Sequence, residues 1–378
     1  MPPIYLDYQA STPLLPEVRE KMTTTLGSLS ANPHSTTHLH GREASSIVEL
    51  ARENLSKLIC CEPENIIFTS GASESNNFLI KQGAALKPNR KTILVSKIEH
   101  KCVLETAHSM SQQGYKIVEI KTDKFGFVDT DHFASELNEE VALVSIMAAN
   151  NEIGTILGLP DLIKATHNVG ALFHSDAAQY ISHADFDASE LDADFVSLSA
   201  HKMYGPKGIG AAYISPHAFE SIEPFITGGG QQDGKRGGTL SPLLCSGFGE
   251  AANQYLRKGH LIRAETIALR DRFFHQMTEI FDEDIRLLGP NLNTRHAGNL
   301  NLQFKQDAST LLGRIAPYLS ASNGSACSSG QITASHVLRA IGLKSEEAQK
   351  CVRFSFGIGL TPEDIDNAAK EFKMVLRT

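Results

Sequence analysis

The chain has 378 residues, 41% hydrophobic and 21% charged, which is ordinary for a globular protein of one large domain or two unequal ones. Its net charge of −8 argues against a broad polyanion-binding surface, so no direct nucleic-acid binding is expected. No apolar run approaches the ~18 residues of a membrane span, and the N-terminus shows no signal-peptide pattern. Six cysteines without metal-ligand spacing predict no metal site and a reducing, cytoplasmic location.

Short apolar runs alternate with helical patterns along the first two thirds of the chain. Strands are predicted at 66–68, 92–96, 141–147, 171–174, 195–198 and 211–214. Apolar residues at helical spacing predict helices over 47–59, 101–112 and 159–167. This alternation is typical of an α/β fold in which helices cover both faces of a mainly parallel sheet.

The first of these strands runs into Thr69-Ser70-Gly71-Ala72-Ser73-Glu74, and a helical pattern follows. A strand, a glycine turn and hydroxyl residues at a helix start can seat an anion, because the first helical N–H groups are unpaired and the dipole favours phosphate. The alternative is a plain helix cap in which Ser73 accepts the bond and no ligand binds.

Polar residues follow the carboxyl ends of the other predicted strands: His100, Asn151, Asp176 with Gln179 shortly after it, and Lys202. Carboxyl ends of parallel strands meet at one edge of a sheet, where ligands bind. A lysine held there can form a Schiff base with an aldehyde cofactor, because desolvation lowers its pKa and frees the amine. The alternative is an ordinary solvated lysine.

The residue types along this edge match the chemistry of pyridoxal 5′-phosphate. Asp176 can keep a pyridine nitrogen protonated, which makes the ring an electron sink. Gln179 and Asn151 can bind the ring hydroxyl, and His100 can stack on the ring and move protons. The candidate phosphate ligands are the backbone of Ala72 and the side chains of Ser73, Ser199 and His201.

The remaining third of the chain predicts a second, smaller domain. A glycine-rich stretch at 227–239 lets the backbone approach a ligand closely, or is a flexible surface turn. A long helical pattern over 257–281 then leads to predicted strands at 299–304 and 352–355 and to a final helix capped by Thr361. The expected division is a large domain of residues 14–258 and a small domain of residues 1–13 with 259–378.

Cys327 is a second candidate reactive centre. It lies within the small, polar residues 320–329, a predicted loop without an apolar wall or a strand ladder. Mobility and exposure there suit a thiolate that visits a substrate and leaves. Cys60 and Cys61 are expected to be inert. The other cysteines, Cys102, Cys245 and Cys351, are predicted to be packing residues.

The sequence resembles the cysteine desulfurases, class V pyridoxal-phosphate enzymes of the iron–sulfur and nitrogenase-associated type, over nearly its whole length. The matching motifs are Tyr5-Leu6-Asp7-Tyr8, Thr69-Ser70-Gly71-Ala72-Ser73-Glu74-Ser75, Glu99-His100-Lys101, Asn150-Asn151-Glu152-Ile153-Gly154, His174-Ser175-Asp176-Ala177-Ala178-Gln179, Ser199-Ala200-His201-Lys202, Gly324-Ser325-Ala326-Cys327 and Arg353-Phe354-Ser355-Phe356-Gly357. The spacing around Cys327 is similar to the subgroup with a long cysteine loop.

The resemblance implies a homodimer of fold type I, with a mainly parallel seven-stranded sheet in the large domain and a smaller α/β C-terminal domain. It implies that Thr239 reaches the partner's cofactor phosphate. Arg353 and Asn32 would hold the substrate carboxylate, with Asn151 also at the substrate.

The implied reaction converts L-cysteine to L-alanine and leaves sulfur as a persulfide on Cys327 for an acceptor protein. Lys202 would move the α-proton, and His100 would take the substrate thiol proton or protonate an intermediate. The acceptor could serve iron–sulfur assembly, tRNA thiolation or DNA phosphorothioation.

The chain ends soon after the last predicted helix, where the iron–sulfur members have a longer tail, so docking of their scaffold protein is not assumed. Two rival functions stay open: a selenocysteine lyase or other pyridoxal-phosphate C–S lyase, and a non-catalytic scaffold subunit.

Overall fold

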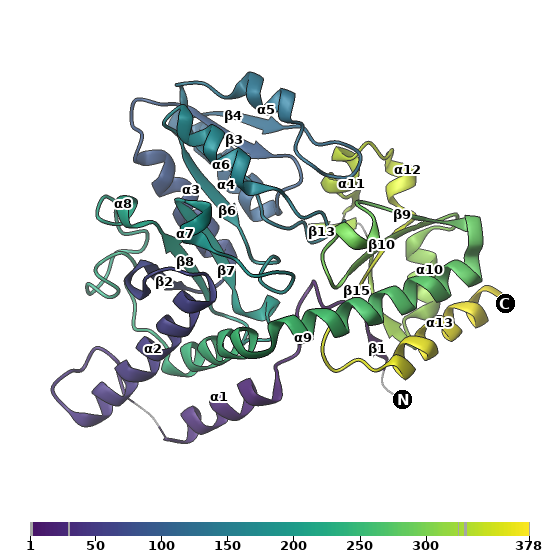
Figure 1. The fold of residues 1–378 in the computed structure, drawn as a ribbon, viewed down its shortest axis with the longest axis horizontal. Helices are drawn as coiled ribbons and strands as arrows, with labels where there is room; N and C mark the ends of the chain where they lie inside the picture. The colour runs from purple at the N-terminus through teal and green to yellow at the C-terminus, as the bar shows by residue number, and fades with distance from the viewer. Residues whose placement is uncertain (1–2, 29–30, 324, 329–330, 378) are drawn as a thin grey trace.

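The structure is a computed structural model that describes residues 3–28, 31–323, 325–328 and 331–377, without the side chains of 325–328, 331–333 and 375–377. A seven-stranded sheet of order β2-β8-β7-β6-β5-β3-β4 forms its centre (Figure 1). The strands are β2 (Ile66–Thr69), β3 (Thr92–Ser96), β4 (Lys116–Ile120), β5 (Val141–Ser145), β6 (Leu172–Asp176), β7 (Phe195–Ser199) and β8 (Gly210–Ile214). Only β8 is antiparallel to its neighbours, so the prediction of a mainly parallel seven-stranded sheet is confirmed.

The edge strand β4 was not predicted from the sequence. Lys116 and Glu119 interrupt its apolar pattern, and most of its residues are partly or fully exposed. The partial exposure of β4 leaves it a weaker apolar pattern than that of the five-residue strands β3, β5 and β7, which are buried throughout.

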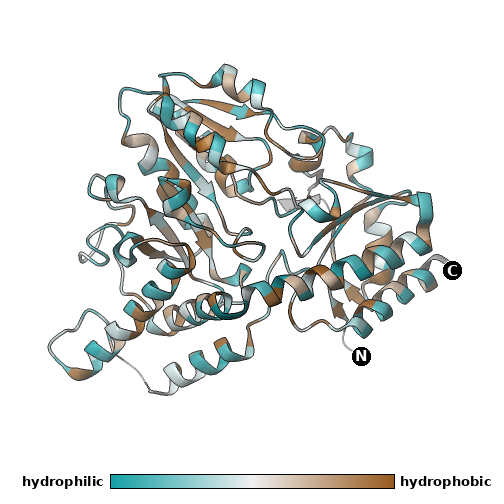
Figure 2. Cartoon of the chain, viewed as in Figure 1, coloured by the Kyte–Doolittle hydropathy of each residue, from teal (hydrophilic) through white to brown (hydrophobic). Residues whose placement is uncertain are grey.

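Helices cover both faces of the sheet, as predicted. The helices α3 (Ala72–Ala85) and α4 (Lys101–Ser109) pack on one face. The other face is covered by α2 (Leu39–Leu58), α6 (Leu159–Asn168) and the first half of α9 (Pro242–Phe281), with α1 (Pro16–Ser28) alongside. The strands are mostly hydrophobic, whereas the helices keep their hydrophilic residues on the outside (Figure 2).

The helix α9 joins this layer to the C-terminal third of the chain. It has 40 residues and loses helical geometry at Lys258, next to the predicted domain boundary. Its second half packs on a four-stranded antiparallel sheet of order β12-β15-β10-β9. The elements there are β9 (Ile285–Leu287), β10 (Asn299–Phe304), α10 (Ala308–Ile315), β12 (Ser322–Asn323), β15 (Cys351–Ser355) and α13 (Pro362–Arg377). The two-domain division itself stays a prediction.

The N-terminal strand joins this second sheet region and not the large sheet. β1 (Ile4–Tyr5) pairs in parallel with β11 (Leu319–Ser320), and Asp7 bridges to Ser355. Residues 9–12 then cross to the large sheet, where the backbone N–H of Thr12 donates to the carbonyl of His201 at 3.0 Å. The start of the chain therefore connects the two sheets beside the carboxyl ends of the large-sheet strands.

The short helices are α5 (Thr130–Glu136), α7 (Ala188–Leu191), α8 (Pro216–Phe219), α11 (His336–Ala340) and α12 (Ser345–Ala348). The hydroxyl of Thr361 accepts from the backbone N–H of Asp364 at 3.1 Å, so the predicted cap of α13 is confirmed. None of the described helices combines the length and apolar composition that crossing a membrane requires.

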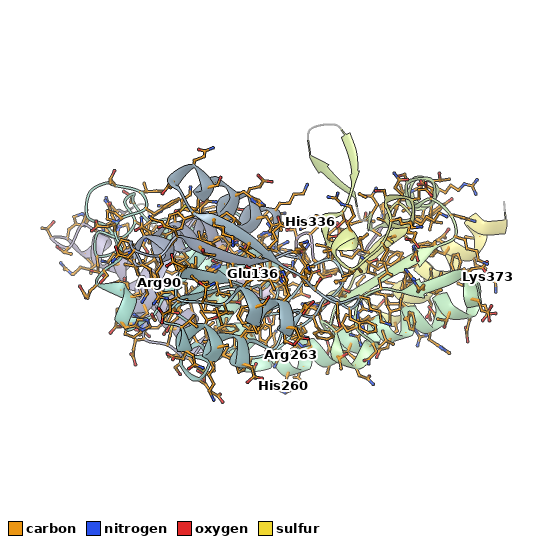
Figure 3. All side chains as sticks on the ribbon, turned by 90° about the horizontal axis from the view of Figure 1, so that it is seen from above. Arg90, Glu136, His260, Arg263, His336 and Lys373 are labelled. Carbon is orange, nitrogen blue, oxygen red and sulfur yellow. The ribbon has the colours of Figure 1, made fainter. Side chains whose placement is uncertain are left out.

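The predicted loop around Cys327 is a hairpin instead, so the expectation of no strand ladder was wrong. β13 (Ser325–Ser328) pairs antiparallel with β14 (Gln331–Ala334), and Cys327 lies opposite Ile332. The β-branched Ile332 and Thr333 favour a strand, and only two residues separate the two strands. The hairpin pairs with neither of the larger sheets and projects from the body above His336 (Figure 3).

Candidate active site

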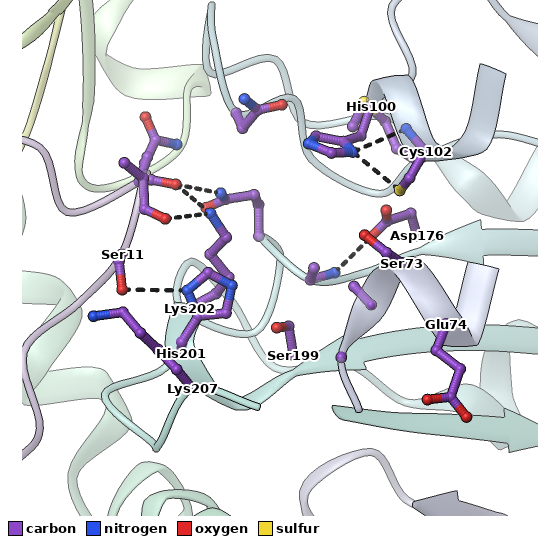
Figure 4. A pocket seen from close by; sticks show the side chains of 18 of the residues that line it. Ser11, Ser73, Glu74, His100, Cys102, Asp176, Ser199, His201, Lys202 and Lys207 are labelled. Carbon is purple, nitrogen blue, oxygen red and sulfur yellow. Dashed lines mark hydrogen bonds between the residues drawn. The ribbon is translucent and has the colours of Figure 1, made fainter. Parts of the chain in front are cut away.

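A cavity of about 660 Å³ lies at the edge where β2, β3, β5, β6 and β7 end (Figure 4). Most of the predicted site residues line it: Ala72, Ser73, His100, Asn151, Asp176, Gln179, Ser199, His201, Lys202 and Arg353. The cavity is also lined by residues that were not predicted, among them Gln9, Ala10, Ser11, Glu74, Cys102 and Lys207. Parallel strand pairing explains the convergence, because it brings residues far apart in sequence to one sheet edge.

Lys202 reaches into this cavity from the short turn Ala200–Lys202 that follows β7. Its Nζ donates to the carbonyl oxygens of Gln9 and Ala10 at 2.6 and 2.8 Å. Burial lowers the pKa of Lys202 to about 8, and the positive charge of Arg353 acts in the same direction. A solvated surface lysine would have neither these two carbonyl partners nor the lowered pKa, so that alternative was wrong.

Residues 9–11 hold the lysine and its neighbours in place. The carbonyl of Gln9 accepts from Nε2 of Gln179 at 3.0 Å as well as from the lysine. The hydroxyl of Ser11 lies 3.2 Å from Nδ1 of His201. Burial lowers the pKa of His201 to about 4, so its ring is neutral near pH 7. The N-terminal segment is therefore part of the site, although none of residues 9–11 was a predicted site residue.

The start of α3 leaves its first N–H groups available to the cavity. The cap residue is Gly71, at φ 154° and ψ 175°, and no side chain of the described residues caps the helix there. Ser73 is exposed to the cavity instead, so its predicted alternative role as a plain cap was wrong. A Cβ on Gly210 of the neighbouring β8 would lie 2.7 Å from the Gly71 backbone, so glycine there allows the turn to sit on the sheet.

Glu74 stabilises this turn by pairing with the glycine-rich stretch. Its carboxylate accepts from the backbone N–H of Ser70 at 2.8 Å and from Nε and Nη2 of Arg236 at 2.8 and 3.2 Å. Burial alone would raise the pKa of Glu74, but these hydrogen bonds bring it below its usual value. The residues 227–239 are therefore attached to the predicted phosphate site by an ion pair, which favours a role beyond a loose surface turn.

Asp176 is a buried carboxylate at the end of β6, with 5% of its surface exposed. Its Oδ1 accepts from the backbone N–H of Ala178 at 3.0 Å. Its Oδ2 accepts from Nδ2 of Asn76 at 2.7 Å. Asn76 is fully buried on α3 and was not predicted, because a polar residue within a helical pattern carries no signal of its own.

His100 begins the helix α4 and faces the same cavity. Its Nδ1 accepts from the backbone N–H of Cys102 at 3.2 Å and lies 3.0 Å from the Cys102 Sγ (Figure 4). Burial lowers the pKa of His100, with Asp176 opposing that shift and Lys202 adding to it. Cys102, predicted to be a packing residue, is therefore a cavity residue in contact with a predicted catalytic one.

Arg353 enters the cavity from β15 of the smaller sheet. Its Nη2 donates to Oδ1 of Asp7 at 2.7 Å and to Oγ of Ser322 at 3.3 Å, and its Nη1 donates to the carbonyl of Asn151 at 3.0 Å. Its Nε is buried and has no partner among the described residues. Asp7 was quoted in a motif but given no role, and the structure makes it the counterion of this arginine.

Three predicted site residues are not placed in the cavity. Asn32 is exposed, and its Oδ1 accepts from the backbone N–H of His34 at 2.9 Å. Thr239 is exposed at the end of the glycine-rich stretch. Cys327 is described by its backbone on β13, and its side chain lies outside the description. The roles of these residues stay predictions.

The residues of the cavity fit pyridoxal phosphate. An uncapped helix start with Ser73 suits a phosphate, a buried carboxylate at Asp176 suits a protonated pyridine nitrogen, and a largely buried amine at Lys202 suits an aldehyde. The cavity volume lies in the ordinary range of cofactor sites, ~300–1,000 Å³.

The chain is similar to known proteins in both sequence and structure. The model of the family "Aminotransferase class-V" matches residues 4–368. A cysteine desulfurase IscS of Rickettsia bellii is 39% identical over 373 residues, which cover 97% of this chain and 90% of the relative. A solved NifS-like protein superposes with a TM-score of 0.92 at 32% identity over 100% of both chains. A structure of SspA in complex with cysteine superposes at 0.83 with 31% identity, over 94% of this chain and 99% of the other. The chain therefore belongs to the class V aminotransferases and, among them, to the pyridoxal-phosphate-dependent cysteine desulfurases.

Proposed function

We propose that this enzyme converts L-cysteine to L-alanine, holds the sulfur as a persulfide on Cys327 and passes it to an acceptor protein. The observation that carries the proposal is the convergence of Lys202, His100 and Asp176 on one cavity that Arg353 also lines. The solved relative with cysteine bound supports an amino-acid thiol as substrate.

The protein's own residues supply binding and proton movement. Pyridoxal phosphate would be held by the α3 N-terminus, Asp176 and Lys202, and it supplies an electron sink for the α-carbon when bound. Lys202, with a pKa of about 8, can be a neutral amine near physiological pH and so can take the α-proton. The carbonyls of Gln9 and Ala10 hold that amine in place.

Arg353 is the proposed anchor of the substrate carboxylate. Its buried Nε–H has no partner among the described residues, so a carboxylate can satisfy it. Asp7 and the Asn151 carbonyl hold the other end of the guanidinium and fix its orientation. Asn151 and Asn32 remain proposed substrate contacts, Asn32 only if its loop approaches a cavity in the assembled enzyme.

Cys327 is the proposed sulfur acceptor. Its thiolate attacks the substrate sulfur, the C–S bond breaks, and its electron pair stays with the substrate side. The product carbon then takes a proton to become alanine, and the sulfur remains bonded to Cys327. His100 is the proposed acceptor of the substrate thiol proton, and burial supports this role because it lowers the pKa of His100 and so favours the neutral ring.

A homodimer is part of the proposal. Thr239 is exposed and lies outside its own chain's cavity, so a partner's phosphate is the site it could serve. The ion pair between Arg236 and Glu74 would then connect the phosphate site of one chain to the segment whose Thr239 binds the phosphate of its partner.

The acceptor pathway is open among iron–sulfur assembly, tRNA thiolation and DNA phosphorothioation. We propose that the enzyme works in the cytoplasm, where the five described free cysteines can stay reduced.

Replacing Cys327 by alanine should abolish alanine formation from cysteine while the bound cofactor keeps its absorbance, because only the sulfur acceptor is removed. Alanine production and the cofactor spectrum are the measurements, with Cys60→Ala, which changes an exposed cysteine, as the matched control. Unchanged turnover in Cys327→Ala would favour a selenocysteine lyase or another C–S lyase.

The rate at which pyridoxal phosphate attaches to the apoenzyme should rise with pH and be half-maximal near pH 8, because the neutral form of Lys202 reacts. Arg353→Gln should move this midpoint to higher pH, since the arginine charge helps to lower the lysine pKa. Stopped-flow absorbance measures both. A midpoint near 10.5, the ordinary value for lysine, contradicts the assigned environment.

Mixed dimers test whether Thr239 acts across the interface. Thr239→Ala and Lys202→Ala are each expected to impair the homodimer. A dimer of one chain of each variant should regain one complete site, because the intact Lys202 would meet the partner's intact Thr239. Cysteine turnover of the purified mixed dimer should approach half that of the wild type. If the mixed dimer turned over cysteine no faster than the Thr239→Ala homodimer, Thr239 would belong to the site of its own chain.

A further inference from the structure

Asn76 and Cys102 connect two predicted functional residues that do not bond to each other directly. Nδ2 of Asn76 lies 2.7 Å from Oδ2 of Asp176 and 3.2 Å from Sγ of Cys102. The same Sγ lies 3.0 Å from Nδ1 of His100. A continuous chain of hydrogen bonds therefore runs from the carboxylate through the amide and the thiol to the imidazole.

Chemistry fixes the direction of each bond. A carboxylate oxygen only accepts, so the amide NH₂ of Asn76 must face Asp176, and its second N–H then points to the sulfur. The sulfur accepts from Asn76 and is also hydrogen-bonded to Ser73, whose hydroxyl can donate to it, so the S–H can donate to His100. Burial, with a smaller contribution from Asp176, raises the pKa of Cys102 to about 11, so this thiol keeps its proton.

Two donors consequently converge on one ring nitrogen of His100. The backbone N–H of Cys102 donates to Nδ1 at 3.2 Å, and the thiol Sγ of the same residue lies 3.0 Å from this nitrogen. A neutral imidazole with its proton on Nε2 can accept at Nδ1, where its single lone pair is shared between the two donors. If the proton were on Nδ1 instead, the ring N–H would face the backbone N–H of Cys102, and neither group could accept a hydrogen bond.

We propose that Asn76 and Cys102 are positioning residues that hold His100 in its neutral form with the proton on Nε2 and tie it to Asp176. The catalytic value of this arrangement rests on the proposed function, because a neutral His100 is needed to receive the substrate thiol proton. The arrangement itself concerns only residues of this chain.

Other charged or titratable groups also act on His100. Asp176 on β6 and Glu152, in the loop after β5, favour its protonated form, whereas Lys202 after β7 and His336 on α11 oppose it. The neighbouring Glu99 is fully buried, and burial raises its pKa well above the usual value. Among the described residues, only Cys102 is hydrogen-bonded to Nδ1 of His100.

The test compares Cys102→Ala, which removes the S–H donor, with Cys102→Ser, which supplies an O–H donor. Full-length holoenzyme with ¹⁵N-labelled histidine is titrated by NMR without substrate, and the His100 signals are identified by their loss in His100→Gln. The pH profile of kcat/KM for cysteine is measured in parallel. Cys60→Ala, which changes an exposed cysteine that does not line the cavity, is the control.

Cys102→Ala should move the His100 titration to higher pH, because the neutral ring loses a donor. On the acidic side of the profile kcat/KM should fall about 3- to 10-fold, the loss expected for one hydrogen bond. Cys102→Ser should restore both measurements. Asn76→Ala should shift them in the same direction, and the double variant should lose less than the sum of the single variants, since they break one chain.

An unshifted His100 titration in Cys102→Ala overturns the proposal, and so does a serine variant that behaves like alanine. A wild-type enzyme that does not turn over cysteine would refute the proposed function instead. The substrate-free titration would still decide whether the thiol controls His100.

Discussion

The burial of one amine against two carbonyl oxygens is the constraint on which the site depends. Lys202 follows the last parallel strand before the reversed β8, and its Nζ bonds to residues 9 and 10 of the N-terminal segment. That segment leaves β1, which pairs with β11 beside the smaller sheet, and crosses to the large one. The site is therefore complete only when the start of the chain, the large sheet and the smaller sheet meet.

Two charged groups near this amine, Asp176 and Arg353, are compensated, one by neutral donors and the other by an opposite charge. Asp176 accepts from an amide and a backbone N–H, and Arg353 is paired with Asp7. Burying a charge without such partners would cost several kcal/mol. The Nε of Arg353 has no partner among the described residues, and neither have other buried polar atoms near the site, such as Nε2 of Gln9 and Oε2 of Glu99.

Much of the fold and the centre of the site could be predicted from the sequence because both follow from local pattern. Apolar runs identify buried strands, and polar residues after them identify the sheet edge where Asp176 and Lys202 meet. β4 was not predicted because this exposed edge strand has a weak apolar pattern. The Cys327 hairpin was mistaken for a loop because its first strand, β13, consists of small residues without an apolar pattern.

The supporting residues could not be predicted, because their roles depend on tertiary contacts. Asn76 looks like any polar helix residue until β6 brings Asp176 beside it. Cys102 looks like a packing residue until the start of α4 turns its sulfur toward His100. Asp7 acquires its role only from Arg353, 346 positions later. Such residues add no periodicity or spacing signal to a single sequence.

The amine of Lys202 is the proposed attachment point of the cofactor. Reduction of the holoenzyme with borohydride, followed by peptide mass mapping, locates the attachment directly. The cofactor mass is expected on the peptide containing Lys202 and not on Lys207, the other lysine among the described residues that line the cavity. A cofactor found on Lys207, or on any lysine outside the cavity, would contradict this assignment.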